Sequence, residues 1–155
     1  MPTPMPREQQ ERLLARMNEF PLHQRLYFEL VGAADGRAEA RLTVGPDVLN
    51  AGGVLHGGVL YAVLDVTAFC AAATTVPTNT NAVTHDLHVS VLRHSPPGAI
   101  LELSAQVRKT GKRVLFVDAE AREARDPETS QARVLAFLKA SERAVTDMGS
   151  DGRVV

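Results

Sequence analysis

Residues 50–75, NAGGVLHGGVLYAVLDVTAFCAAATT, hold a single carboxylate, Asp65, within an otherwise apolar stretch. Apart from Asp65 and Thr67, all residues from Val59 to Ala73 are hydrophobic or small. Ionised side chains are rarely buried without a partner or a purpose, because removing a charge from water costs free energy. The run is rich in Ala and longer than a buried strand, so it predicts a helix over about Gly58–Thr75.

Alternation of apolar and polar residues predicts strands on both sides of this helix. Before it, we expect a short amphipathic helix within residues 7–17 that continues to about Arg25. A strand over Leu26–Val31 follows, ended by a turn at Gly32–Gly36, and then a second strand whose inward residues are Ala38, Ala40, Leu42 and Val44. After the helix, the expected strands are 80–92, 100–109, 113–123 and 131–145, with turns at 94–98, 110–112 and 124–130.

This order of elements predicts the fold class. A helix that is apolar on nearly every side must be surrounded by other elements. The sequence therefore predicts an α+β architecture in which a curved antiparallel sheet wraps around one long central helix. Residues 1–25 are expected to form a tail and short helix, residues 26–146 the domain, and residues 147–155 a flexible C-terminal tail. Such a sheet leaves strand edges and an open helix flank, so we expect a homo-oligomer.

Composition narrows the class of protein. The chain has 155 residues, 45% hydrophobic and 23% charged, as in a one-domain globular protein. A net charge of -1, 5% aromatic residues and no Trp argue against nucleic-acid or anionic-membrane partners. The single Cys70 excludes an internal disulfide, and with no apolar core of a signal peptide at the N-terminus it favours a cytoplasmic location. The central Asp65 and the lack of flanking Lys or Arg favour a core helix over a membrane span.

Asp65 and the loop before it are the main candidates for chemistry. The side chain either lies on a narrow solvent-facing stripe or stands at an apolar cleft as a general base or nucleophile. The loop supplies Asn50 and the HGG of His56, Gly57 and Gly58. A Gly-rich loop that enters a helix leaves backbone N–H groups unpaired, where they can hold a phosphate or a developing oxyanion. The same glycines would also serve a simple tight turn.

The spacing between these groups predicts how they could cooperate. Gly57 and Asp65 are eight residues apart, which is about 12 Å along a helix. One reacting carbonyl cannot lie against both groups of the same chain. If they act together, the partner subunit must bring its own carboxylate to this Gly57, so the chemistry requires a symmetric dimer with two composite sites.

The pattern N-x5-HGG-x6-D on a loop that leads into a long apolar helix resembles the hotdog-fold thioesterases of the phenylacetate-pathway (PaaI-like) branch. The resemblance covers about residues 26–145 and includes the strand order. It implies that Asp65 is the base or nucleophile, that the Gly57 N–H polarises the carbonyl, and that Asn50 places the water. It further implies that His56 braces the loop or contacts the thioester and that Thr84, on the following strand, assists the carboxylate. This chain has Val66 where relatives often have a small residue.

Other candidates are weaker. His85 and His88 are three residues apart on an expected strand, so we expect their side chains on opposite faces and predict no metal site. Cys70 has no charged activator nearby in sequence and is expected to pack structurally. Basic residues near the strand ends either form a solvated rim or, with Gly58, bind the phosphates of coenzyme A. They are Arg93, His94, Arg108, Lys109, Lys112 and Arg113.

The sequence thus predicts a homodimeric or homotetrameric acyl-CoA thioesterase without a cofactor beyond the coenzyme A of its substrate. Aryl-acyl and medium-chain acyl groups both remain possible substrates. One alternative is a non-catalytic acyl-CoA-binding or regulatory hotdog domain. Another is an enoyl or hydroxyacyl thioester hydratase, which His56 and Asp65 fit poorly.

Overall fold

The computed structural model describes residues 5–77, 80–124 and 133–145. The predicted tail at 147–155, the first four residues and nearly all of the expected turn at 124–130 lie outside this part. In chain order the elements are α1 (Arg7–Glu19), α2 (Pro21–Arg25), β1 (Phe28–Ala34), β2 (Arg37–Thr43), a 3₁₀ turn (Pro46–Val48), α3 (Gly57–Ala73), β3 (Asn81–Val91), β4 (Ile100–Thr110), β5 (Val114–Glu123) and β6 (Arg133–Val145).

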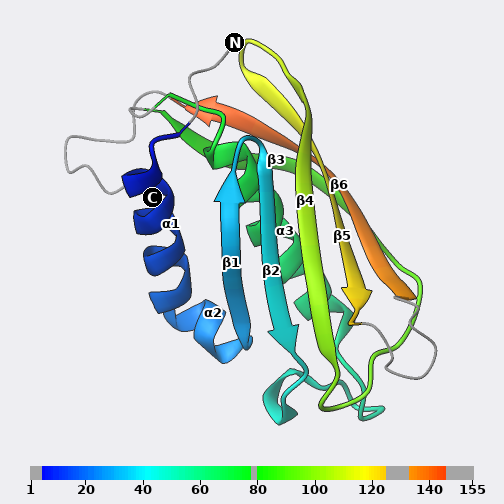
Figure 1. The fold of residues 1–155 in the computed structure, drawn as a ribbon. Helices are drawn as coiled ribbons and strands as arrows, with labels where there is room; N and C mark the ends of the chain where they lie inside the picture. The colour runs from blue at the N-terminus through cyan, green and yellow to red at the C-terminus, as the bar shows by residue number, and fades with distance from the viewer. Residues whose placement is uncertain (1–4, 78–79, 125–132, 146–155) are drawn as a thin grey trace.

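The strands form one antiparallel sheet in the order β1-β2-β4-β5-β6-β3. The sheet curves around α3, and α1 lies beside β1 at one end (Figure 1). At the other end β3 pairs with β6 and with no further strand of the described ranges, so β3 is an edge strand. The predicted α+β architecture, with a curved sheet wrapped around one long helix, is confirmed.

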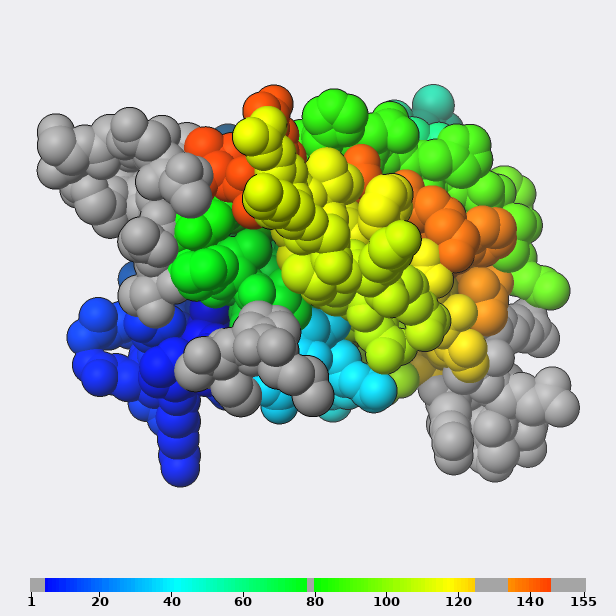
Figure 2. Space-filling view, turned by 90° about the horizontal axis from the view of Figure 1, so that it is seen from above, coloured from blue at the N-terminus to red at the C-terminus, as the bar shows by residue number. Residues whose placement is uncertain are grey.

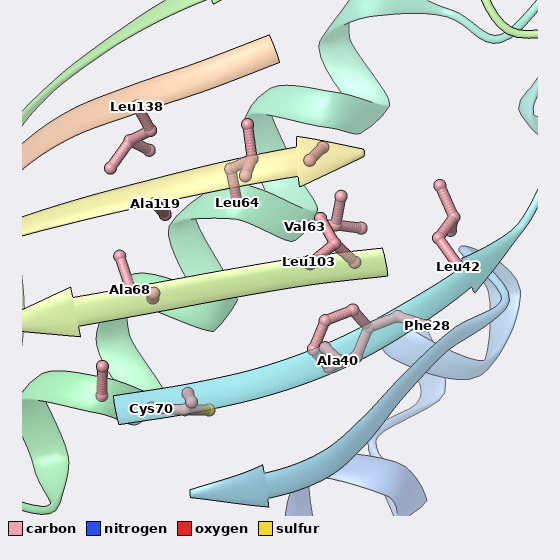
Figure 3. Close-up of a cluster of buried hydrophobic side chains, with 14 of the residues drawn as sticks. Phe28, Ala40, Leu42, Val63, Leu64, Ala68, Cys70, Leu103, Ala119 and Leu138 are labelled. Atoms are coloured by element: carbon pink, nitrogen blue, oxygen red, sulfur yellow. The ribbon is translucent and has the colours of Figure 1, made fainter. Parts of the chain in front are cut away.

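The core lies between α3 and the concave face of the sheet. Figure 3 shows Val63, Leu64 and Ala68 of α3 directed toward the strands, and these three side chains are at most 1% exposed. On β2 the predicted inward residues Ala38, Ala40 and Leu42 are likewise buried. Burial of such side chains stabilises the fold by roughly 1.5–3 kcal/mol for each large one. The period-2 pattern of β2 was therefore sufficient to assign its buried face.

The first hairpin differs from the prediction. β1 does not end at Gly32, because a bulge between Leu30 and Gly32 lets the strand continue to Ala34. Glycine is common beside bulges, where the backbone bends. The turn consists instead of Asp35 and Gly36, with φ of 49° and 74°. Two left-handed residues with the sequence Asp-Gly favour a two-residue hairpin turn, and this is the signal that locates it.

The edge strand β3 also contains a bulge, between Thr84 and Asp86. The extra residue His85 shifts the alternation, so that Thr84 faces Glu142 and Leu87 faces Ala140 on the neighbouring strand. The prediction that His85 and His88 lie on opposite faces assumed a regular strand, and the bulge interrupts that regularity; both residues are exposed. The bulge matters for the site, because it sets which side chains of β3 face α3.

Among the described residues, no helix combines the length and the hydropathy that a membrane crossing requires.

α3 is the most apolar helix and spans 17 residues. Its flank near β3 is not covered by the sheet: Tyr61 is 45% exposed, and Ala62, Val66 and Phe69 are only half-buried.

Candidate active site

Asp65 lies on the flank of α3 that faces β3, and its side chain is half-buried. Its Oδ1 accepts a hydrogen bond of 2.7 Å from the Thr84 hydroxyl. The other carboxylate oxygen, Oδ2, forms no hydrogen bond with any residue that the structure describes. The structure therefore brings together the carboxylate and the threonine that the sequence singled out, and leaves one oxygen of the carboxylate available.

A second carboxyl group, which the sequence analysis missed, lies behind this pair. Glu142 of β6 is directly opposite Thr84 in the β3–β6 register and is 0% exposed. Its Oε1 lies 3.2 Å from the same Thr84 hydroxyl. The signal was present in β6: a period-2 pattern through the buried Leu138 and Ala140 places Glu142 on the inward face.

The environment of Glu142 alters its acidity. Burial, together with the negative charge of Asp65, raises the pKa of Glu142 from 4.5 to about 7. The hydrogen bond with Thr84 opposes these effects only in part. A perturbed carboxyl group beside a partly exposed one is a common feature of catalytic sites.

The N-terminus of α3 carries the second half of the candidate site. His56 is the N-cap, and its Nδ1 accepts a hydrogen bond of 2.9 Å from the Gly58 N–H. This contact engages the Gly58 amide and braces the entry to the helix. The Gly57 N–H, the first of the helix, forms no hydrogen bond within the described part of the chain. A Cβ at Gly57 would meet only Val91 Cγ2, at 4.0 Å, so a ligand can approach this amide closely.

Asn50 organises the loop that precedes the helix. Its Oδ1 accepts hydrogen bonds from the Gly52 N–H (2.9 Å) and the Val54 N–H (3.3 Å). The side-chain NH₂ has no partner among the described residues and can still donate to a ligand or a water molecule. Asn50 thus shapes the loop through one atom while its other polar atom stays available.

The two halves of the candidate site lie at different positions along the molecule. Gly57 lies beside Val91 near the C-terminal end of β3, whereas Asp65 contacts Thr84 nearer its start. The eight residues between them still correspond to about 12 Å of helix. Within one chain, the carboxylate and the amide do not face the same small group.

The basic residues expected to bind coenzyme A do not form one cluster. Arg93 and His94 are exposed in the loop before β4, whereas Lys109, Lys112 and Arg113 are exposed at the β4–β5 hairpin. That hairpin lies next to the start of β3 and the end of β6 when seen from above (Figure 2). The two groups occupy opposite ends of β4, about 30 Å apart at ~3.3 Å per residue. Arg108 is engaged in an ion pair of 2.9 Å with Asp118.

The remaining candidates are resolved by their surroundings. Cys70 is 0% exposed in the core, and burial raises its pKa to about 12, so it packs structurally as predicted. No three His, Cys, Asp or Glu side chains in the described ranges come together as a metal site. A depression of about 370 Å³ lies over the outer face of the sheet between β2, β4, β5 and β6; Arg108 lines it, whereas Asp65 and Gly57 do not.

Comparison with known proteins assigns this chain to a family. The sequence matches the thioesterase superfamily over residues 52–130, which include α3 and β3–β5. No curated protein matches it.

Solved structures resemble the fold. The E. coli PaaI protein from the phenylacetic acid degradation operon is 22% identical with a TM-score of 0.74, and the match covers 89% of this chain and 92% of that protein. A thioesterase family protein from Silicibacter pomeroyi is 21% identical with a TM-score of 0.78, covering 87% and 96%. A conserved protein from Pseudomonas aeruginosa is 25% identical with a TM-score of 0.73, covering 84% and 98%.

The helix wrapped by an antiparallel sheet is thus a hotdog fold. The chain belongs to the thioesterase superfamily, and its class of activity is that of a thioester hydrolase. The resemblance to PaaI-like hotdog thioesterases is confirmed.

Proposed function

We propose that this protein hydrolyses acyl-CoA thioesters, of aryl-acyl or medium-chain acyl groups, at sites shared between two subunits. The observation that carries the proposal is the half-buried Asp65 held by Thr84 on the helix that begins with His56 and Gly57. Coenzyme A enters as part of the substrate, and we expect no resident cofactor.

In the proposed reaction, Asp65 acts on the thioester carbonyl through its free oxygen. It either takes a proton from the attacking water or attacks the carbonyl carbon itself to form an anhydride that water then cleaves. The Gly57 N–H donates to the oxygen on which negative charge develops. In the first route the carbon–sulfur bond breaks, and the proton that Asp65 took from water passes to the departing thiolate. In the second route the thiolate leaves as the anhydride forms and takes up a proton when water cleaves the anhydride. Both routes yield the carboxylic acid and free coenzyme A. In this scheme the Asn50 NH₂ donates to the attacking water.

A homodimer formed through β3 would create this shared site. β3 is an edge strand, and the adjacent uncovered flank of α3 exposes Tyr61. Unpaired edges and exposed apolar side chains favour association. If two copies of β3 pair antiparallel about an axis between Leu87 and His88, Thr84 lies opposite the partner's Val91. This arrangement brings Asp65 toward Gly57 of the partner subunit, as the chemistry requires.

The substitution Asp65→Asn tests the catalytic role. We expect it to retain the fold and to lower kcat by roughly 10²–10⁴, the usual contribution of a positioned acid or base. Release of free thiol from aryl, short-, medium- and long-chain acyl-CoA would be followed colorimetrically. Asp35→Asn makes the same chemical change in an exposed turn and should leave turnover unchanged.

This assay also separates the alternatives. A non-catalytic binding domain would bind acyl-CoA without releasing thiol, and Asp65 would be dispensable. A hydratase would change the absorbance of an enoyl thioester and leave the thioester intact. Full thiol release by the Asp65→Asn variant would refute the assignment of this carboxylate.

Complementation between subunits tests whether the site is composite. Gly57→Val would place a side chain in the open space before the amide, so each single variant should be inactive. Subunits of Asp65→Asn mixed with subunits of Gly57→Val should regain about a quarter of wild-type activity, because every mixed dimer then contains one intact site. Sites contained within one chain would give no recovery.

A further inference from the structure

Three carboxyl and hydroxyl oxygens from three different elements lie in a row behind the candidate active site. Asp65 Oδ1 on α3 is 2.7 Å from Thr84 Oγ1 on β3, which is 3.2 Å from Glu142 Oε1 on β6. The bulge at His85 creates this alignment, because it places Thr84 directly opposite Glu142. The row runs from the half-buried carboxylate to a fully buried carboxyl group.

The number of protons in this row restricts its protonation state. A hydroxyl has one proton to donate, and an ionised carboxylate can only accept. Thr84 therefore cannot donate to both carboxyl groups at once. The shorter contact assigns its proton to Asp65, so the contact with Glu142 is a hydrogen bond only when Glu142 is the donor.

Apart from the Thr84 hydroxyl that it shares with Asp65, the surroundings of Glu142 offer nothing that would hold a negative charge. Its Oε2 has no hydrogen-bond partner, and no ion pair to it forms within the described part of the chain. The neighbour of Glu142 on β5 is Leu115, the neighbour on β3 is Thr84, and α3 contributes Asp65. Asp65 is the one ionisable group among the described residues whose charge acts on Glu142, and it is also negative. An ionised Glu142 would be a buried charge without compensation.

We propose that Glu142 is a positioning residue that retains its proton and donates it to the Thr84 hydroxyl, which in turn donates its own proton to Asp65. This chain of hydrogen bonds fixes the orientation of the Asp65 carboxylate, with Oδ2 directed away from Thr84. When Glu142 loses its proton, the two carboxylates compete for the single proton of Thr84, and Asp65 loses its fixed orientation. The role assigned to Glu142 in turnover rests on the proposed thioesterase function, whereas its protonation does not.

Infrared spectroscopy tests the protonation directly. The wild-type protein at pH 6 should show the carbonyl band of a protonated buried carboxyl group, and this band should disappear as the pH rises through about 7. Glu142→Gln should lack the band, whereas Glu39→Gln, which alters an exposed carboxylate on β2, should retain it. A wild-type spectrum without the band, or a band that persists in Glu142→Gln, would overturn the proposal.

Kinetics tests the positioning role. Glu142→Gln keeps a neutral donor toward Thr84, so its kcat at pH 6 should stay within a few-fold of wild type. The kcat of wild type should fall as the pH rises through about 7, and that of Glu142→Gln should not. Glu142→Leu removes the donor and should lower kcat by at least about tenfold with little change in KM, as expected when an acting group loses its orientation. Equal pH profiles for wild type and Glu142→Gln would refute the role. If no thioester is hydrolysed but the band is present, the proposed thioesterase function is refuted, whereas the proposed protonation of Glu142 is supported.

Discussion

The clearest consequence of the buried Glu142 is a dependence of stability on pH that Glu142→Gln should abolish. The pKa of Glu142 is about 7 in the folded protein against 4.5 as its ordinary value. Between these values the native state holds a proton that the unfolded chain has released, so stability falls as the pH rises from 4.5 to 7. The difference corresponds to about 3 kcal/mol at 1.36 kcal/mol per pKa unit. A Gln at this position binds no proton in either state and contributes no such slope.

The measurement is the free energy of unfolding of both proteins at several pH values between 4.5 and 8. Because the chain has no Trp, urea unfolding would be followed by circular dichroism, at one protein concentration to hold any association constant. All other titrating groups are common to the two proteins and, apart from Asp65, whose charge acts on Glu142, cancel in the difference. We expect the stability of wild type relative to Glu142→Gln to drop by about 3 kcal/mol across this range. Two curves that stay parallel would show that Glu142 is not a buried acid with a raised pKa.

Three further predictions concern the loop, the cap and the core. His56→Ala should lose the helix cap and lower the free energy of unfolding by about 1 kcal/mol. His56→Asn keeps an acceptor for the Gly58 N–H and should lower it less, and thermal unfolding would compare the stabilities of the two variants. Asn50→Asp keeps the oxygen that holds the loop but loses the free NH₂, so thermal stability should be nearly unchanged while thiol release slows; equal rates would exclude a role of the NH₂. Leu64→Ala should cost about 2–5 kcal/mol because the side chain is fully buried, against little for the 57% exposed Leu22→Ala, as measured by urea unfolding.

Local patterns predicted most of the fold. The alternation in Ala38, Ala40 and Leu42 identified the buried face of β2, because a half-buried strand exposes every second side chain. The apolar run that became α3 was too long for a strand. The first hairpin was misplaced at Gly32, because a bulge extends β1 and a bulge depends on pairing with the neighbouring strand.

The site was predicted only in part. The motif singled out Asp65 and Thr84, and the structure places them in contact. In the sequence, Glu142 is one of several charged residues near the C-terminal end. Its importance comes from Thr84, the residue that faces it on β3. The six basic residues looked like one group in sequence, but the length of β4 separates them.

The sequence by itself determined the elements, their order and the presence of a lone carboxylate on an apolar helix. It could do so because hydrophobic periodicity and turn-forming residues are local signals that each span only a few residues. The tertiary structure decided which polar groups meet: the bulge at His85 and the β3–β6 register place Thr84 between Asp65 and Glu142. Strand register is fixed by packing between segments that are 58 residues apart in the chain, and no local pattern carries that information.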